Sequence, residues 1–124
     1  MGSYSMAKEN EFVTHLVELL EPLGPVQAKA MFGGFGIYLR GLMFGLVADD
    51  TFYLKVDEIN RPDYEKKGLG PFTYQRGGKK FAMSYYRAPG EAIDDAQDLC
   101  AWAKRAYDAA VRVAGHKKKS GKKG

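Results

Sequence analysis

Residues 31–56 read MFGGFGIYLRGLMFGLVADDTFYLKV. Short apolar runs in this stretch are separated by Gly41 and by the pair Asp49-Asp50, residue types that are typical of tight turns. The pattern predicts three consecutive antiparallel strands, over about residues 35–40, 42–47 and 51–56. The stretch contains no Ser, Cys or His, so its chemistry is that of apolar and aromatic faces with glycines between them.

The flanking segments complete an α+β pattern. Apolar spacing and capping residues predict helices over about residues 9–20, 58–67 and 91–113. Gly77-Gly78 is the clearest hairpin signal of the chain and separates two further strands, residues 72–76 and 79–87. The predicted order is therefore α-βββ-α-ββ-α. It corresponds to a two-layer α+β sandwich, with a five-stranded antiparallel sheet and the helices on one face.

The positive charge of the chain is concentrated at its end. The 124 residues include 19 Lys and Arg against 15 Asp and Glu, for a net charge of +4. Five of these lysines lie in the last eight residues, and without them 14 basic residues face 15 acidic ones. We expect residues 1–8 to be a disordered start or a tag remnant, residues 9–114 to form one domain, and residues 115–124 to be a disordered lysine-rich tail.

No targeting or membrane segment is visible in the sequence. No apolar run reaches the roughly 18 residues that a bilayer requires, and the first residues do not resemble an export signal. Cys100 is the only cysteine, so an internal disulfide is excluded. These features favour a reducing, cytoplasmic location.

The glycines at the start of the first strand invite comparison with a phosphate-binding loop. Gly33, Gly34 and Gly36 do not match the spacing of such loops, and they lead into a strand rather than into the helix N-terminus that binds phosphate. We interpret them as structural, permitting a bulge, a tight bend or a close backbone approach. The two histidines provide no convincing catalytic base, so we expect no enzyme activity, metal or cofactor.

The predicted hairpin is the best candidate for a contact surface. Large side chains alternate on both faces of residues 81–87, and the helices can cover only one face of the sheet. The uncovered face would expose either Tyr74, Tyr86 and Arg87, or Tyr85 with its neighbours, and could support self-association. Plain packing, or stacking on single-stranded nucleic acid beside the basic residues of the hairpin, are alternatives.

The lysine-rich tail could bind phosphates without sequence preference. Such charge runs are at least as often solubilising segments with no dedicated partner. Any nucleic-acid binding is expected to be weak, and to be carried by the tail lysines, which are Lys117, Lys118, Lys119, Lys122 and Lys123.

Five short motifs in order resemble the N-terminal domain of the TfoX/Sxy competence regulators. They are MFGGFGIY from Met31, MFGLVADD from Met43, FYLK from Phe52, PFTY from Pro71 and MSYY from Met83. The resemblance covers about residues 9–113. It implies a two-layer fold of the secretion-chaperone-like kind, and a bacterial cytoplasmic protein in transcriptional control of DNA uptake. The resemblance also implies that the protein acts together with the cyclic-AMP receptor protein. Longer members of the family carry a second, helical domain, where this sequence has its lysine-rich tail.

The sequence therefore predicts a non-catalytic, single-domain protein that acts by protein contact, in regulation of competence or transcription. Two alternatives remain open from the residues alone. One is a nucleic-acid-binding protein that uses the tail and the aromatic face of the sheet, and the other is a domain that binds a small ligand or a metal.

Overall fold

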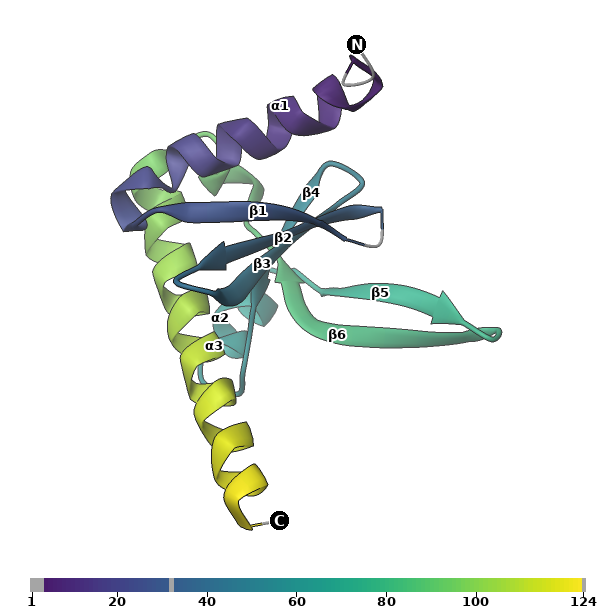
Figure 1. Cartoon of the computed structure of the whole chain (residues 1–124), viewed down its shortest axis with the longest axis vertical. Coiled ribbons are helices and arrows are strands. Elements are labelled where there is room, and N and C mark those ends of the chain that lie inside the picture. Colours follow the sequence, from purple (N-terminus) through teal and green to yellow (C-terminus); the bar gives the residue numbers. More distant parts are fainter. Residues whose placement is uncertain (1–3, 32, 124) are drawn as a thin grey trace.

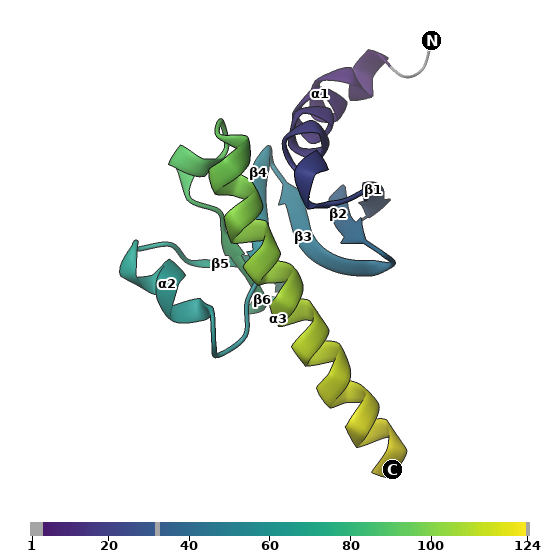
Figure 2. The ribbon, with the colours of Figure 1, turned by 90° about the vertical axis from the view of Figure 1, so that its left-hand side faces the viewer.

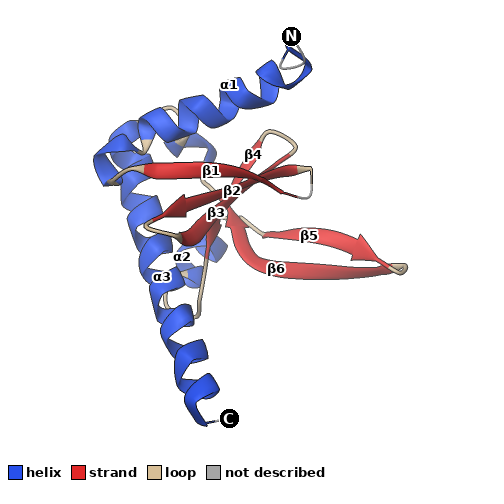
Figure 3. Cartoon of the chain, in the orientation of Figure 1, coloured by secondary structure: helices blue, strands red, loops and turns tan. Residues whose placement is uncertain are grey.

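The computed structural model describes residues 4–31 and 33–123, with side chains for residues 11–31 and 33–115. The helical elements are α1 (Tyr4–Leu19), η1 (Glu21–Leu23), α2 (Arg61–Lys66), η2 (Gly90–Ala92) and α3 (Ala96–Lys123). The strands are β1 (Val26–Met31), β2 (Gly34–Leu39), β3 (Leu42–Ala48), β4 (Thr51–Lys55), β5 (Pro71–Arg76) and β6 (Lys79–Arg87). The α+β class is thus confirmed, as Figure 3 shows.

The sheet has six antiparallel strands in the order β1-β2-β3-β4-β6-β5, so the prediction of five strands was wrong by one. The additional strand is β1, which pairs with β2 along its full length, from Val26 opposite Leu39 to Met31 opposite Gly34. Its sequence, VQAKAM, has one β-branched residue and only small or polar side chains before the final methionine. Strand propensity alone is weak there, and pairing with the apolar β2 stabilises it.

Tight turns fix the register of the hairpins. Positive φ angles occur at Arg40 (52°), Gly41 (79°), Asp49 (53°), Asp50 (54°), Gly77 (60°) and Gly78 (80°). Each pair forms a two-residue turn with both central residues left-handed, which matches the twist of the strands that it joins. Glycine tolerates this conformation without strain, and Asp does so more readily than most residues.

The helices lie on one face of the sheet (Figure 1), and α3 crosses that layer between α1 and α2 (Figure 2). α3 packs mainly on β3 and β4. Its core side is made of Leu99, Ala103, Ala106 and Ala110, all at most 4% exposed. These small side chains let the helix approach the sheet closely, while larger core residues such as Leu16, Ile37 and Phe44 fill the space around it.

The predicted ends of two helices need correction. α1 begins at Tyr4, within the segment expected to be disordered, and residues 1–3 lie outside the described chain. α3 begins at Ala96 rather than at residue 91, because Asp95 accepts hydrogen bonds from the amides of Gln97 and Asp98 and so caps the helix there. At the other end, its backbone stays helical to Lys123, through most of the predicted tail. Lysine is a good helix former, and positive charge is favourable at a helix C-terminus.

The β5–β6 hairpin projects from the body of the molecule (Figure 1). Only the last residues of β6 pair with β4: Arg87, Tyr86 and Tyr85 lie opposite Tyr53, Leu54 and Lys55. We call the part that precedes this pairing, residues 71–84, the hairpin arm. None of the helices in the described chain combines the length and the apolar composition needed to cross a bilayer.

A candidate contact groove on the uncovered sheet face

The sheet face that points away from the helices is apolar and aromatic. Phe52 and Leu54 of β4 are in the core, so Tyr53 between them faces the other way. Its cross-strand neighbours Leu46 and Arg87 share that face, and the ring of Phe72 meets the ring of Tyr53 edge-on at 5.2 Å. We call this surface the open face.

A groove runs along the open face between the ends of β1, β2 and β3 and the hairpin arm. Its volume is about 560 Å³. Arg76 provides the one charged side chain among the residues that line it, and Tyr74 provides a hydroxyl. The lining residues are Met31, Gly34, Leu46, Val47, Ala48, Phe72, Tyr74, Arg76 and Met83. The groove is therefore suited to apolar side chains, with one fixed cation at its arm side.

Three glycines lie at the start of β2, and one of them, Gly34, lines this groove. A Cβ on Gly34 would collide with the carbonyl oxygen of Val47, and a Cβ on Gly36 would lie 2.8 Å from the Met31 sulfur and 3.2 Å from the Met43 sulfur. Gly33 has open space around it but a φ of +77°. The three glycines thus act through backbone conformation and close packing. Gly34 and Gly36 lie within β2 and Gly33 directly precedes it, so they offer no helix N-terminus to a phosphate.

The aromatic rings of the arm are held in pairs. Tyr74 and Phe81 stack at 5.6 Å with an interplanar angle of 27°, although they are 40% and 42% exposed. Because two stacked rings lose less mobility on binding than two free ones, such a pair is a suitable anchor for a partner.

Charge is distributed unevenly around the groove. Residues 69–90 contain four basic residues, Arg76, Lys79, Lys80 and Arg87, and no acidic residue. On the opposite side, Asp49 and Asp50 line a smaller adjoining hollow that shares Gly34 and Val47 with the groove. The arm is thus a basic wall, and the β3–β4 turn is an acidic corner.

Of the two predicted groupings, the one that puts Tyr74, Tyr86 and Arg87 on a single face is wrong, because Tyr86 lies on the opposite face from Arg87. Tyr74 lines the groove, and Arg87 is exposed on the open face. Tyr85 points to the open face but is only 8% exposed, under the ammonium group of Lys55 at 5.0 Å. Burial raises the pKa of its hydroxyl to about 12. Tyr86 faces the helices, where its ring meets that of Tyr64 at 6.0 Å.

Several groove residues were missed by sequence reasoning, namely Met31, Leu46, Phe72 and Met83. The alternation of Phe72 with Tyr74, and of Phe81 with Met83, is a signal that could have grouped four of the arm residues on one face. Met31 could not be placed without β1. The side chains of the five tail lysines lie outside the described residues, so nucleic-acid binding by the tail stays a prediction.

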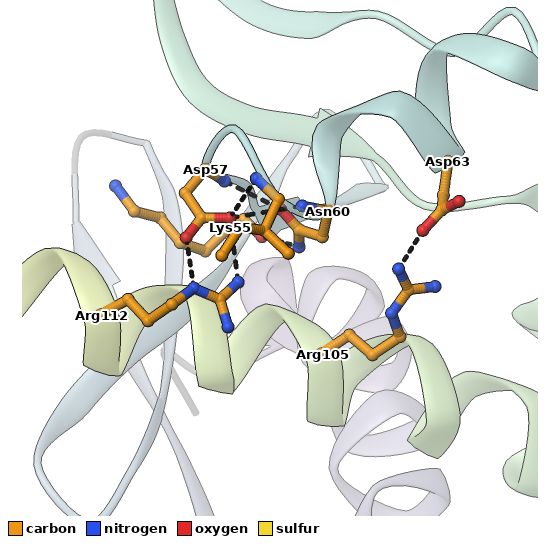
Figure 4. A network of polar contacts seen from close by, with 7 residues as sticks. Lys55, Asp57, Asn60, Asp63, Arg105 and Arg112 are labelled. Carbon is orange, nitrogen blue, oxygen red and sulfur yellow. Dashed lines mark hydrogen bonds and ion pairs between the residues drawn. The ribbon is translucent and has the colours of Figure 1, made fainter.

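A second cluster of charged side chains is structural. Arg112 of α3 donates to both carboxylate oxygens of Asp57, from Nε at 2.5 Å and from Nη2 at 2.9 Å (Figure 4). Asp57 also accepts the amides of Ile59 and Asn60, and the buried Asn60 side chain donates to the carbonyl of Lys55. The hydrogen bond from Arg112 holds the pKa of Asp57 down at about 2. The cluster ties the segment after β4 to α3, as does the ion pair of Arg105 with Asp63.

The described residues provide neither a metal site nor an activated cysteine. Among the residues described, no three His, Cys, Asp or Glu side chains come close enough together to hold a metal ion. Burial raises the pKa of the Cys100 thiol, which donates a hydrogen bond to the carbonyl of Leu19 at 3.2 Å. That thiol is therefore packed between helices rather than poised for reaction.

Comparison with known proteins places this fold in a family. The family model described as the TfoX N-terminal domain matches residues 18–110, which include every strand of the sheet. The chain belongs to the TfoX N-terminal domain family. The matched region contains every residue that lines the groove.

Two characterised proteins with this domain are similar to the chain. Protein Sxy of Escherichia coli K12 is 25% identical over 95 residues, which are 77% of this chain and 46% of Sxy. The DNA transformation protein TfoX of Haemophilus influenzae is 29% identical over 94 residues, which are 74% of this chain and 43% of that protein. The chain thus spans less than half the length of these two relatives. The name of the second relative refers to DNA transformation, and neither name is that of an enzyme.

Proposed function

We propose that this TfoX N-terminal domain protein is a non-catalytic regulator, acting in the cytoplasm on competence or transcription by binding another protein through its open face. The observation that carries the proposal is the groove of about 560 Å³, which is lined almost entirely by apolar side chains. Contiguous apolar surface of this kind on a soluble domain marks an interaction site more often than a packing defect.

The lining of the groove supports binding rather than catalysis. General acid–base chemistry needs a group that gains and loses a proton near neutral pH, and the lining residues include no His, Asp, Glu, Lys or Cys. An arginine side chain, such as the one in this lining, is not a general acid or base at physiological pH. Methionine and aromatic side chains, by contrast, adapt well to the apolar side chains of a partner.

The first partner to test is a transcription regulator of the cyclic-AMP receptor protein type, which the resemblance to competence regulators implies. Purified regulator would be titrated with the chain and with a Tyr74→Ser, Phe81→Ser double variant. Both side chains are partly exposed, so the fold should tolerate the change. We expect the double variant to lose most of its binding, and to lose activity on a reporter of a DNA-uptake gene.

Matched controls are provided by two exposed apolar residues away from the groove, Ile59 (62% exposed) and Val111 (47% exposed). Ile59→Ser and Val111→Ser remove a similar amount of exposed apolar surface, but they leave the groove unchanged. The proposal is wrong if these controls reduce binding and reporter activity as much as the double variant does.

A further inference from the structure

We propose that the occupant of the groove is an extended acidic segment of the partner protein, which adds to the sheet along β5 and places alternate apolar side chains in the groove. This inference rests on the proposed function, because it specifies the chemistry of the partner at the same site.

The edge of β5 is open to such an addition. β5 is the last strand of the sheet and pairs with β6 alone among the described strands. An edge strand presents a row of unpaired backbone donors and acceptors. Residues 72–75 carry no charge to repel another strand, whereas the opposite edge, β1, has Lys29 near its centre. β5 is therefore the less protected of the two edges.

The side chains of β5 point in the required direction. Phe72, Tyr74 and Arg76 alternate along the strand, and all three line the groove. A strand added beside β5 would direct every second side chain to the same face. Those side chains would lie over the floor made by Met31, Leu46 and Val47. Backbone hydrogen bonds would then supply affinity, and the apolar floor would supply selectivity.

Charge selects an acidic segment and orients it. A carboxylate beside the arm can pair with Arg76, in the two-pronged geometry that guanidinium groups favour. Lys79 and Lys80 extend the positive potential toward the tip of the arm, with no acidic residue between positions 69 and 90 to oppose it. Asp49 and Asp50 at the other side of the groove would repel acidic residues there. The acidic part of the segment should thus lie toward the arm tip.

Two other occupants fit less well. Single-stranded nucleic acid needs free aromatic faces and several cations in the groove, but Tyr74 stacks on Phe81, and Arg76 is the one cation among the lining residues. A second copy paired through β5 would set two basic arms side by side, and like charges in neighbouring strands are destabilising.

The test uses fluorescence anisotropy with a labelled synthetic peptide in which Leu and Phe alternate with Thr and one end carries three consecutive Glu. The matched peptide has Lys in place of each Glu, and a third peptide carries N-methylated backbone amides on one edge. We expect the Glu peptide to bind at least about tenfold more tightly than the Lys peptide, and N-methylation to abolish binding. The variant Arg76→Glu, Lys79→Glu, Lys80→Glu should reverse the preference. Lys66→Glu, at the end of α2, is the control that should not.

The outcomes separate this inference from the proposed function. One outcome is that the Glu and Lys peptides bind equally well and that the Tyr74→Ser, Phe81→Ser variant binds neither. This outcome would overturn the preference for an acidic segment, but the proposed function of the groove as a protein-binding site would stand. If no peptide binds and that variant captures the regulator normally, both proposals are wrong. Tighter binding of oligothymidylate, or a concentration-dependent dimer that the variant abolishes, would assign the groove to nucleic acid or to a second copy.

Discussion

At the scale of single residues, Gly34 and Gly33 show two different reasons for glycine. Gly34 has no room for a Cβ, because the backbone carbonyl of Val47 occupies the place. Gly33 has room but adopts a φ of +77°, which costs an L-residue about 1–2 kcal/mol. A backbone carbonyl cannot move aside as a flexible side chain can, so the two positions should respond differently to the same substitution.

We therefore expect Gly34→Ala to lower the free energy of unfolding by about 3 kcal/mol, and Gly33→Ala to lower it by about 1 kcal/mol. Urea unfolding followed by circular dichroism measures both values. Gly70→Ala is the control, because a Cβ there meets no atom within 4 Å and the residue lies outside the left-handed region. If the Gly34→Ala protein is as stable as this control, the backbone of β3 at Val47 can move away from β2 without lowering the free energy of unfolding, and the assigned close packing is wrong.

Asp57 makes a pH-dependent contribution to stability. Its pKa is about 2 in the folded protein, against an ordinary value of 3.8, because Arg112 donates hydrogen bonds to the ionised form. The folded state thus holds the proton less tightly than the unfolded state. The resulting stabilisation is complete above about pH 4 and is lost as the pH falls toward about 2. Partial solvent screening keeps its size to about 1–2 kcal/mol.

The variant Asp57→Asn keeps an oxygen for the amides of Ile59 and Asn60 but loses the charge. Its free energy of unfolding should be about 1–2 kcal/mol below that of the unchanged protein at neutral pH, and the difference should shrink in acid. Asp98→Asn, at a partly exposed position in the first turn of α3, serves as the comparison. A difference that stays constant between pH 7 and pH 2 would contradict the assigned role of the ion pair.

At the scale of elements, the turns were predictable and the edge strand was not. Gly41, Asp49-Asp50 and Gly77-Gly78 each specify a two-residue turn through their own backbone preferences, so a short stretch of sequence is enough to find them. β1 depends instead on what lies beside it, since its small and polar residues become a strand only against β2. The groove depends on the same unpredicted strand, because Met31 at the end of β1 lines the groove together with residues of β5.

The positions of the Tyr85 and Tyr86 side chains show another limit of sequence reasoning. Alternation places these neighbours on opposite faces, but it does not tell which face the helices cover. It also does not reveal that Tyr85 is buried on the open face, since that burial arises where β4 and β6 meet, 30 residues apart in the sequence at Lys55 and Tyr85. Local pattern thus predicted the elements, and long-range packing decided which side chains a partner can reach.

The prediction of nucleic-acid binding concerns the lysines at the end of the chain. If the five tail lysines bind duplex DNA, full neutralisation of five phosphates gives a slope near −4.5 for log K against log salt. We expect a smaller slope, no sequence preference, and loss of binding when residues 116–124 are removed. Titration of labelled duplexes at several salt concentrations measures this. Sequence-specific binding that survives the truncation would point instead to a reader of DNA bases within the domain.

At the scale of the whole molecule, the hairpin arm is basic and the start of α3 is acidic. The arm carries basic residues on the open face, while Glu91, Asp94, Asp95 and Asp98 gather at the start of α3 in the helical layer. A partner with an acidic segment would approach the open face along a favourable potential, and would be repelled from the α3 start. Such steering acts on the rate of encounter more than on the lifetime of the complex.

We accordingly expect added salt to slow association with the partner and to change the dissociation rate little. Stopped-flow mixing of the chain with the labelled Glu peptide, at ionic strengths from about 0.01 M to about 0.15 M, measures both rates as the Debye length falls from about 30 Å to about 8 Å. The charge-reversed arm variant should associate slowly at every salt concentration. An association rate that does not depend on salt concentration would show that electrostatic steering does not contribute to association.

The narrow attachment of the arm has a consequence for the history of the family. Three residue pairs between β4 and β6, together with the hydrogen bonds that Ser84 accepts from Val56 and Lys55, join the arm to the strand region of β4, and most arm residues contribute nothing to the core. Substitutions at residues 75–82 of the arm, between the family motifs that begin at Pro71 and Met83, can therefore accumulate without unfolding the domain, while the core must keep its volume and shape. Partner choice can diverge quickly in such a protein while its scaffold changes slowly. Homologues that share this scaffold are then expected to differ most in whom they recognise.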